Sequence, residues 1–174
     1  EGEVDFGLVS FPRSTKHLQY VSWQQEPMRI VCSAEHPLAA QHEVSLSQLR
    51  RLDMIGFDRA LQLRQEIDQC LARAGIEVNV RMEFDNADSM VRAIQANRGI
   101  GILPEAAVRR ETANGSLRVV ACRDLRMTRP LGIIFRRSGR LSRAASEFGS
   151  LLLGRPLESG NRSKSGSGKL SVES

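Results

Sequence analysis

Aromatic residues are scarce in this sequence, with one tryptophan, one tyrosine and six phenylalanines among 174 residues. Leucine, isoleucine and valine far outnumber them, which favours mixed α/β packing over a β-sandwich rich in tyrosine and tryptophan. There is also no apolar run approaching the roughly 20 residues of a transmembrane helix, and no signal peptide is visible. We therefore expect a globular, cytoplasmic domain with no membrane contact.

Cysteine is nearly as rare, and the three cysteines are far apart in the sequence: Cys32, Cys70 and Cys122. They form no Cys-x-x-Cys pair, and their spacing from the three histidines matches no metal-binding pattern. This distribution favours buried thiols in a reducing compartment. We expect no metal site.

Motifs that carry catalytic chemistry are missing too. Gly99 and Gly101 lack the third glycine of a dinucleotide-binding loop, and they follow an expected helix instead of a strand. There is no Gly-x-Ser-x-Gly elbow and no His-Glu-x-x-His sequence. Asp5-Phe6-Gly7 matches a kinase tripeptide without the loops that accompany it in kinases. The sequence therefore predicts neither an enzyme nor a cofactor.

Positive charge is in excess but not concentrated. The net charge is +5 and the isoelectric point is near 9.7. The arginine pairs at residues 50–51, 109–110 and 136–137 are widely separated, unlike the continuous basic stripe of many nucleic-acid-binding domains. A basic surface face is the better interpretation, and the charge alone does not predict DNA binding.

The clearest positive signal is an alternation of strands and helices between residues 80 and 105. Residues 80–84 read as a strand, and residues 87–97 read as a helix whose apolar side chains recur on one face. A buried strand follows at residues 100–103, and Pro104 can open the next helix. This order is typical of an α/β fold.

The rest of the chain continues the alternation. Further strands are expected at residues 4–9, 28–33, 54–57, 117–121 and 131–136. Further helices are expected after Ser45, from about Asp58 to Gly75, at residues 104–112 and at residues 142–152. Such alternation predicts α/β packing with a largely parallel sheet. Residues 158–174 are rich in Ser, Gly, Asn and Lys and predict a disordered tail.

Polar side chains follow several of these strands where each strand ends. The carboxyl ends of parallel strands meet at one edge of a sheet, so these groups should line one crevice. Helix N-termini there would suit a carboxylate or phosphate-like ligand with Arg13, Arg59 or Arg64 as charge partners, although Asp85 argues against a purely anionic ligand. Each residue could equally be a helix cap or an ordinary surface group. The candidate contacts are Ser10, Phe11, Arg13, Phe57, Asp58, Arg59, Arg64, Asp85 and Asn86.

A series of short motifs, in this order, resembles the effector-binding domain of LysR-type transcriptional regulators. One of them is Gly101-Ile102-Leu103-Pro104-Glu105. The resemblance covers roughly residues 2–153 and rests on residues 2–9, 35–39, 44–49, 67–68 with Gly75, 88–99, 101–105, 115–117, 129–133 and 136–138.

The resemblance implies a two-lobed fold of the type II periplasmic-binding-protein kind within residues 1–157. The second lobe, about residues 17–135, would be nearly complete. Remnants of the first lobe would lie at about 1–14 and 138–157, with the final helix returning to that lobe. Family effector contacts would follow the crossover strand and Phe57, and would include the turn at residues 85–86.

The implied function is regulatory: a small-molecule effector, with anions among the candidates, would shift the angle between the lobes of a dimeric or tetrameric regulator. DNA would be contacted through an N-terminal helix-turn-helix that this sequence does not contain. The first-lobe helix that would pair with residues 65–74 of a partner subunit is also absent. Alternatives on the same fold are a solute-binding protein of a transport system and an enzyme.

Overall fold

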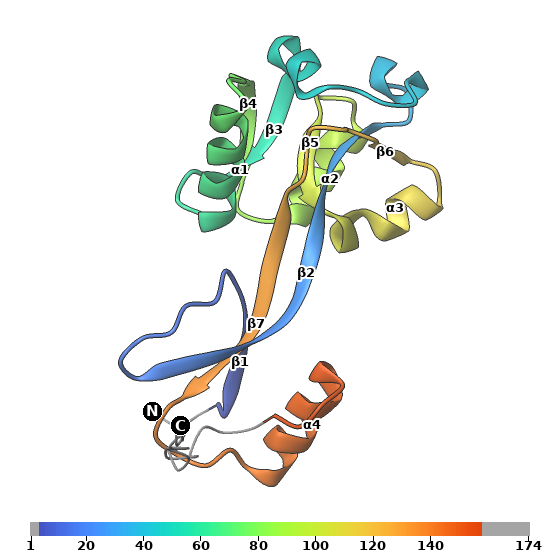
Figure 1. The fold of residues 1–174 in the computed structure, drawn as a ribbon. Coiled ribbons are helices and arrows are strands. Elements are labelled where there is room, and N and C mark those ends of the chain that lie inside the picture. Colours follow the sequence, from blue (N-terminus) through green and yellow to red (C-terminus); the bar gives the residue numbers. More distant parts are fainter. Residues whose placement is uncertain (1–3, 158–174) are drawn as a thin grey trace, which may run out of the picture.

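A long two-stranded ribbon forms the backbone of the fold and joins a larger lobe to a smaller one (Figure 1). In this computed structural model, the residues described are 4–157. The ribbon consists of β2 (Leu18–Ser33) and β7 (Thr128–Arg136), which pair antiparallel from Leu18↔Arg136 to Pro27↔Thr128. The expected strand at 28–33 is thus the end of a much longer strand, and its first half runs through the ribbon.

The larger lobe contains a five-stranded arrangement in the order β4–β3–β5–β2–β6. Strands β3 (Asp53–Phe57) and β4 (Asn79–Phe84) are parallel, and a parallel bridge between Met54 and Ile100 connects β3 to the start of β5 (Gly101–Pro104). β5 and β6 (Leu117–Val120) each pair antiparallel with β2.

The expectation of a largely parallel sheet is therefore wrong. The run β3, β4 and β5 is parallel, because a helix crosses over between each pair of strands. All pairs that involve β2 or β7 are antiparallel. A buried apolar run in a sequence indicates a strand but not its direction.

Helices in the larger lobe follow the expected strand–helix order. α1 (Gln62–Arg73) follows β3 and α2 (Ala87–Gln95) follows β4. The segment expected as one helix at 104–112 is a 3-10 turn, η3 (Glu105–Val108), that leads into α3 (Arg109–Ala113). Two further 3-10 helices, η1 (Pro37–Ala40) and η2 (Leu46–Arg51), precede β3. In η2, the side chain of Gln48 accepts from the Ser45 N–H at 2.8 Å, as the capping-box pattern predicts.

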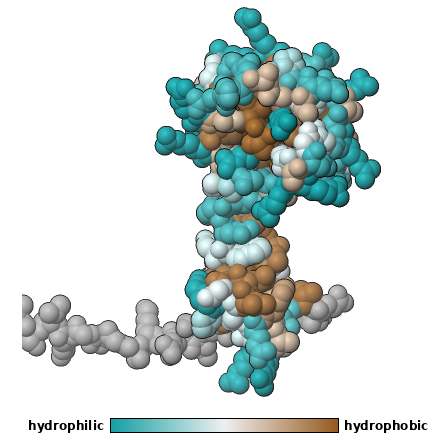
Figure 2. Space-filling model, turned by 90° about the vertical axis from the view of Figure 1, so that its right-hand side faces the viewer, coloured by the Kyte–Doolittle hydropathy of each residue, from teal (hydrophilic) through white to brown (hydrophobic). Residues whose placement is uncertain are grey.

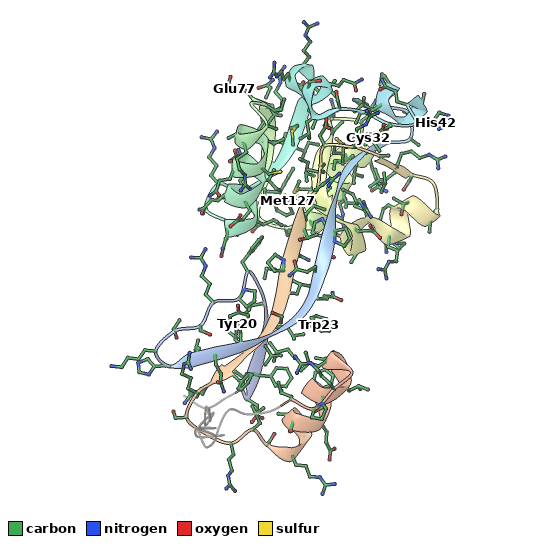
Figure 3. The ribbon with its side chains drawn as sticks, in the orientation of Figure 1. Tyr20, Trp23, Cys32, His42, Glu77 and Met127 are labelled. Atoms are coloured by element: carbon green, nitrogen blue, oxygen red, sulfur yellow. The ribbon has the colours of Figure 1, made fainter. Side chains whose placement is uncertain are left out.

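The smaller lobe is built from β1 (Phe6–Ser10), α4 (Arg143–Leu153) and the part of the ribbon on which they pack. β1 pairs antiparallel with β7, from Phe6↔Phe135 to Ser10↔Leu131. The indole Nε1 of Trp23 donates to the carbonyl oxygen of Leu152 at 2.9 Å and ties α4 to the ribbon (Figure 3). Figure 2 shows apolar surface over this lobe, where Leu8, Phe148 and Leu151 are exposed.

Two separate apolar clusters correspond to the two lobes. The larger cluster draws on buried residues from Met28 to Val120 and includes fully buried Ile30, Leu49 and Ile94. Fully burying a side chain of this kind stabilises the fold by about 1.5–3 kcal/mol. The smaller cluster contains Ile133, Phe135 and Leu157, and packs against Phe6, Val21 and Leu152.

The expected range of the larger lobe, residues 17–135, contains residues of both apolar clusters. Val21, Ile133 and Phe135 lie within that range but belong to the smaller cluster. The reason is that β2 and β7 run through both lobes, so a boundary along the chain does not coincide with a boundary in space. The expected tail at residues 158–174 and the first three residues lie outside the part of the chain that the structure describes. Within residues 4–157, no helix has the length and hydropathy needed to cross a bilayer.

Candidate functional site

The carboxyl ends of β1, β3, β4 and β5 meet at a hollow of about 340 Å³, beside the start of β7. We call it the strand-end hollow. Its position agrees with the rule that open α/β sheets bind ligands beyond the carboxyl ends of their strands. The residues that line it are Ser10, Phe11, Phe57, Leu61, Gln62, Leu63, Asp85, Asn86, Ala87, Pro104, Ala107 and Arg129.

One wall of the hollow is formed by the turns that follow β3 and β4. The Asp58 N–H donates to the carbonyl oxygen of Phe84 at 2.8 Å, which holds the two turns together. Asn86 is the N-cap of α2: its Oδ1 accepts from the Ser89 N–H at 2.8 Å, and its Nδ2 donates to Asp85 Oδ1 at 2.6 Å. Asn86 therefore both caps α2 and lines the hollow.

The end of β1 supplies another part of the lining, because Ser10 and Phe11 reach the hollow from the smaller lobe. Phe11 has a left-handed backbone, with φ of +51°, which is uncommon for a residue with a side chain. Its ring packs against the apolar cluster of the larger lobe. A conformation of this kind costs of order 1–3 kcal/mol and is concentrated at functional sites.

Arg129 is a lining residue that sequence reasoning missed. It lies opposite Glu26 in the register of β2 and β7, and its Nε donates to Glu26 Oε2 at 2.9 Å, with Nη2 donating to the same oxygen. Glu26 Oε1 also accepts from the Ala106 N–H at 3.3 Å. The two residues are 103 positions apart in the chain, so the strand register was the signal needed to find them.

Arg64, expected to be a charge partner of the ligand, belongs to the scaffold and does not line the hollow. It lies in the first turn of α1, where its buried side chain donates to the Phe57 carbonyl oxygen at 2.7 Å and to Glu83 Oε1 at 3.0 Å. It also pairs with Asp68 at 2.8 Å. Burial by itself lowers the pKa of Arg64, but its hydrogen bonds to the two carboxylates outweigh this effect and raise the pKa. The sequence conceals this role because Arg64 and Asp68 look like an ordinary surface pair four residues apart on a helix.

Three other candidates also lie outside the lining. Asp58 Oδ1 accepts from the Ala60 N–H at 2.8 Å, and Arg59 pairs with Glu83 at 3.0 Å on the surface. Arg13 is exposed in the loop between β1 and β2. The structure therefore brings together Ser10, Phe11, Phe57, Asp85 and Asn86, and places Arg13, Asp58, Arg59 and Arg64 elsewhere.

The lining of the hollow combines polar, charged and apolar groups. Ser10 supplies a hydroxyl group, Gln62 and Asn86 supply amides, and Asp85 and Arg129 supply opposite charges beside apolar side chains. Such a mixture orients a small ligand. Within residues 4–157, no three His, Cys, Asp or Glu side chains are arranged to hold a metal ion.

Comparison with protein-family models gives a match to the LysR substrate binding domain over residues 1–156. Among curated relatives, the HTH-type transcriptional regulator YfeR of Shigella flexneri is 32% identical over 145 residues, which are 83% of this chain and 46% of that protein. The HTH-type transcriptional activator CmpR of Synechocystis is 24% identical over 144 residues, 83% of this chain and 47% of that protein. The chain thus spans about half the length of these relatives, which are named as regulators rather than enzymes.

Solved structures share the fold. The regulatory domain of Synechocystis CcmR, in complex with 2-PG, aligns with a TM-score of 0.78 at 22% identity, covering 87% of this chain and 73% of that one. The effector binding domain of QuiR, in complex with shikimate, aligns with a TM-score of 0.74 at 19% identity, covering 86% and 70%. The expected fold, α/β and periplasmic-binding-protein-like, is confirmed by these alignments.

Proposed function

Because the chain belongs to the LysR substrate-binding domain family, we propose that it is the ligand-sensing domain of a transcriptional regulator and that the strand-end hollow is its effector site. The observation that carries this proposal is the convergence of strand ends from both lobes on one hollow: Ser10 and Phe11 from the smaller lobe, and Phe57, Asp85 and Asn86 from the larger. The two similar domains whose structures are complexes with small molecules support it.

The mechanism is differential binding between conformations. A ligand that contacts β1 on one side and the turns after β3 and β4 on the other favours one angle between the lobes. The ribbon transmits that angle, because both of its strands run through both lobes (Figure 1). For the ligand to control DNA binding, the full-length regulator must have a different affinity for DNA at each of the two angles between the lobes.

Other parts of the proposal concern the full-length protein. The named relatives are about twice as long as the region that this chain matches. We propose that DNA contact through a helix-turn-helix, assembly into dimers or tetramers, and a cytoplasmic location are properties of that longer protein. None of these properties is assigned to the 174 residues by themselves.

The test is ligand binding by the 174-residue chain. Native mass spectrometry should detect a co-purifying small molecule, or a metabolite library should contain a compound that raises the melting temperature. The Ser10→Ala variant should weaken its binding, whereas Ser22→Ala should not, because Ser22 is exposed on the ribbon outside the hollow. Equal affinities in both variants and in Asp85→Ala would remove the site from the hollow.

A functional readout separates the proposal from a transport role. The same ligand should change the affinity of the full-length regulator for its operator DNA. A ligand that binds in the hollow but leaves DNA affinity unchanged would favour a solute-binding protein on this fold.

A further inference from the structure

We propose that Arg129 recognises a carboxylate group of the effector, and that Glu26 is the positioning residue that aims its guanidinium into the strand-end hollow. This inference rests on the proposed function and adds the ligand class to it. It concerns a pair formed across the ribbon, at the point where β7 leaves the larger lobe (Figure 1).

The guanidinium of Arg129 keeps donors available for a ligand. Its Nε–H and one Nη2–H are directed at Glu26 Oε2. A guanidinium has five N–H donors, so three remain, and within residues 4–157 the Arg129 side chain makes no hydrogen bond besides the two to Glu26. The side chain is 25% exposed and lines the hollow. It therefore faces both the buried glutamate and the open space.

Glu26 is unusual because it is buried, with only 6% of its side chain exposed. A buried ion pair contributes little net stability, because removing both charges from water costs about as much as their attraction returns. Its structural effect is orientation. Glu26 Oε2 holds Arg129, while Oε1 accepts from the Ala106 N–H in η3, which fixes the glutamate from a second side. An arginine side chain loses rotamer freedom when a ligand fixes it, and here part of that ordering is complete before a ligand arrives.

The chemistry of the lining narrows the ligand class. The planar guanidinium fork matches a carboxylate better than a point charge does. Much of the remaining surface is apolar and comes from Phe11, Phe57 and Pro104. Asp85 adds a negative charge to the lining, which disfavours polyanions. The hollow of about 340 Å³ suits a small molecule. These features select a compact monocarboxylate with a hydrocarbon body.

The experiment compares carboxylates with matched amides. Butyrate, hexanoate, butyramide, hexanamide and the polyanion citrate are titrated into the 174-residue chain, with binding followed by calorimetry and melting temperature. Wild type should prefer a monocarboxylate to its amide by roughly 10- to 100-fold, the range of a hydrogen bond to a charged group. Citrate should bind more weakly than the best monocarboxylate.

Variants separate recognition from positioning. Arg129→Gln should abolish the carboxylate preference, and Arg129→Lys should reduce it while keeping the charge. Glu26→Ala should reduce the preference, and Glu26→Gln should restore it, because the amide oxygen can still accept from Arg129. The control is Arg29→Gln, which removes a more exposed ion pair with Glu105 elsewhere on β2 and should leave the preference intact.

Contrary outcomes are distinct. An Arg129→Gln protein that keeps the wild-type preference overturns the assignment of Arg129, and if that variant does not fold, an unchanged preference in Arg129→Lys does the same. An unchanged preference in Glu26→Ala overturns the positioning role. If no monocarboxylate binds at millimolar concentration while native mass spectrometry finds another ligand in the hollow, the ligand class is wrong and the proposed function stands. Absence of any ligand contradicts the proposed function itself.

Discussion

The backbone N–H of Phe11 donates a hydrogen bond of 2.8 Å to the carbonyl oxygen of Pro130. Pro130 directly follows Arg129, so this bond fastens the turn after β1 to the strand that carries the lining arginine. Phe11 also reaches the apolar cluster of the larger lobe, although β1 itself belongs to the smaller lobe. One residue therefore connects the two lobes at the edge of the strand-end hollow.

Two substitutions of Phe11 should distinguish the effect of its ring on stability from the effect of its backbone conformation. Phe11→Ala and Phe11→Gly both remove the ring, but only alanine retains the cost of the left-handed conformation. The glycine variant should therefore be more stable than the alanine variant by about 1 kcal/mol. Urea denaturation measures the difference. Both variants should bind ligand more weakly than wild type, and an alanine variant as stable as the glycine variant would show that the conformation carries no strain.

Gly132 should be intolerant of a side chain. A Cβ at this position would lie 2.8 Å from Pro12 Cγ and 3.0 Å from the Val21 carbonyl oxygen, so Pro12 or the ribbon would have to shift. Gly132→Ala should cost about 1–3 kcal/mol of unfolding free energy, as overpacking does. Gly7→Ala on the neighbouring strand is the matched control, because the nearest atom to its Cβ would be 3.5 Å away. Equal stabilities of the two variants would contradict this close approach.

Arg64 and Arg59 should differ sharply although both pair with Glu83. Arg64→Ala leaves the buried carbonyl oxygen of Phe57 and the carboxylate of Asp68 without their donor, which should cost about 2–3 kcal/mol. Arg59→Ala breaks an exposed pair and should cost less than about 1 kcal/mol. Chemical denaturation tests both values. If the Arg59→Ala protein folds but binds ligand more weakly than wild type, Arg59 is part of the effector site.

Acid should weaken the contacts of Glu83. Hydrogen bonds from Arg64 and Arg59 hold the pKa of the Glu83 carboxyl below its usual value of 4.5. A carboxyl with a lowered pKa in the folded state stabilises the protein above its usual pKa, and that contribution is lost as the pH falls through the lowered value. The stability difference between wild type and Glu83→Gln should therefore be larger near pH 6 than near pH 3.

The measurement is urea denaturation of both proteins at the two pH values, with Glu77→Gln as a control outside the Arg64 network. A difference that does not change with pH would show that the carboxyl titrates alike in the folded and unfolded states.

Patterns among neighbouring residues predicted most of the helices and strands that position the lining of the hollow. The apolar spacing of α2 and its cap at Asn86 are properties of neighbouring residues, so the turn after β4 was predictable. The end of β3 at Phe57 was predictable for the same reason, whereas Phe11 reaches the hollow through the antiparallel pairing of β1 with β7, which the rule for parallel strands does not describe.

Long-range pairing was not predictable in this way. The contact between Glu26 and Arg129 depends on the register of two strands that are distant in sequence. The position of Arg64 away from the hollow was not predictable either, because its burial follows from how α1 packs on β3 and not from the residues beside it. The antiparallel direction of β7 is likewise a property of the chain's return between lobes.

The ribbon determines which motions the two lobes can make. Backbone pairing fixes the register of β2 against β7, and that register shifts by one residue between Ser22 and Gln24. Sliding one strand along the other would break this ladder, whereas flexing the pair leaves it whole. A change in the angle between the lobes therefore bends or twists the ribbon without shortening it, and Trp23, which has no partner in the register, marks the one interruption of the pairing between β2 and β7.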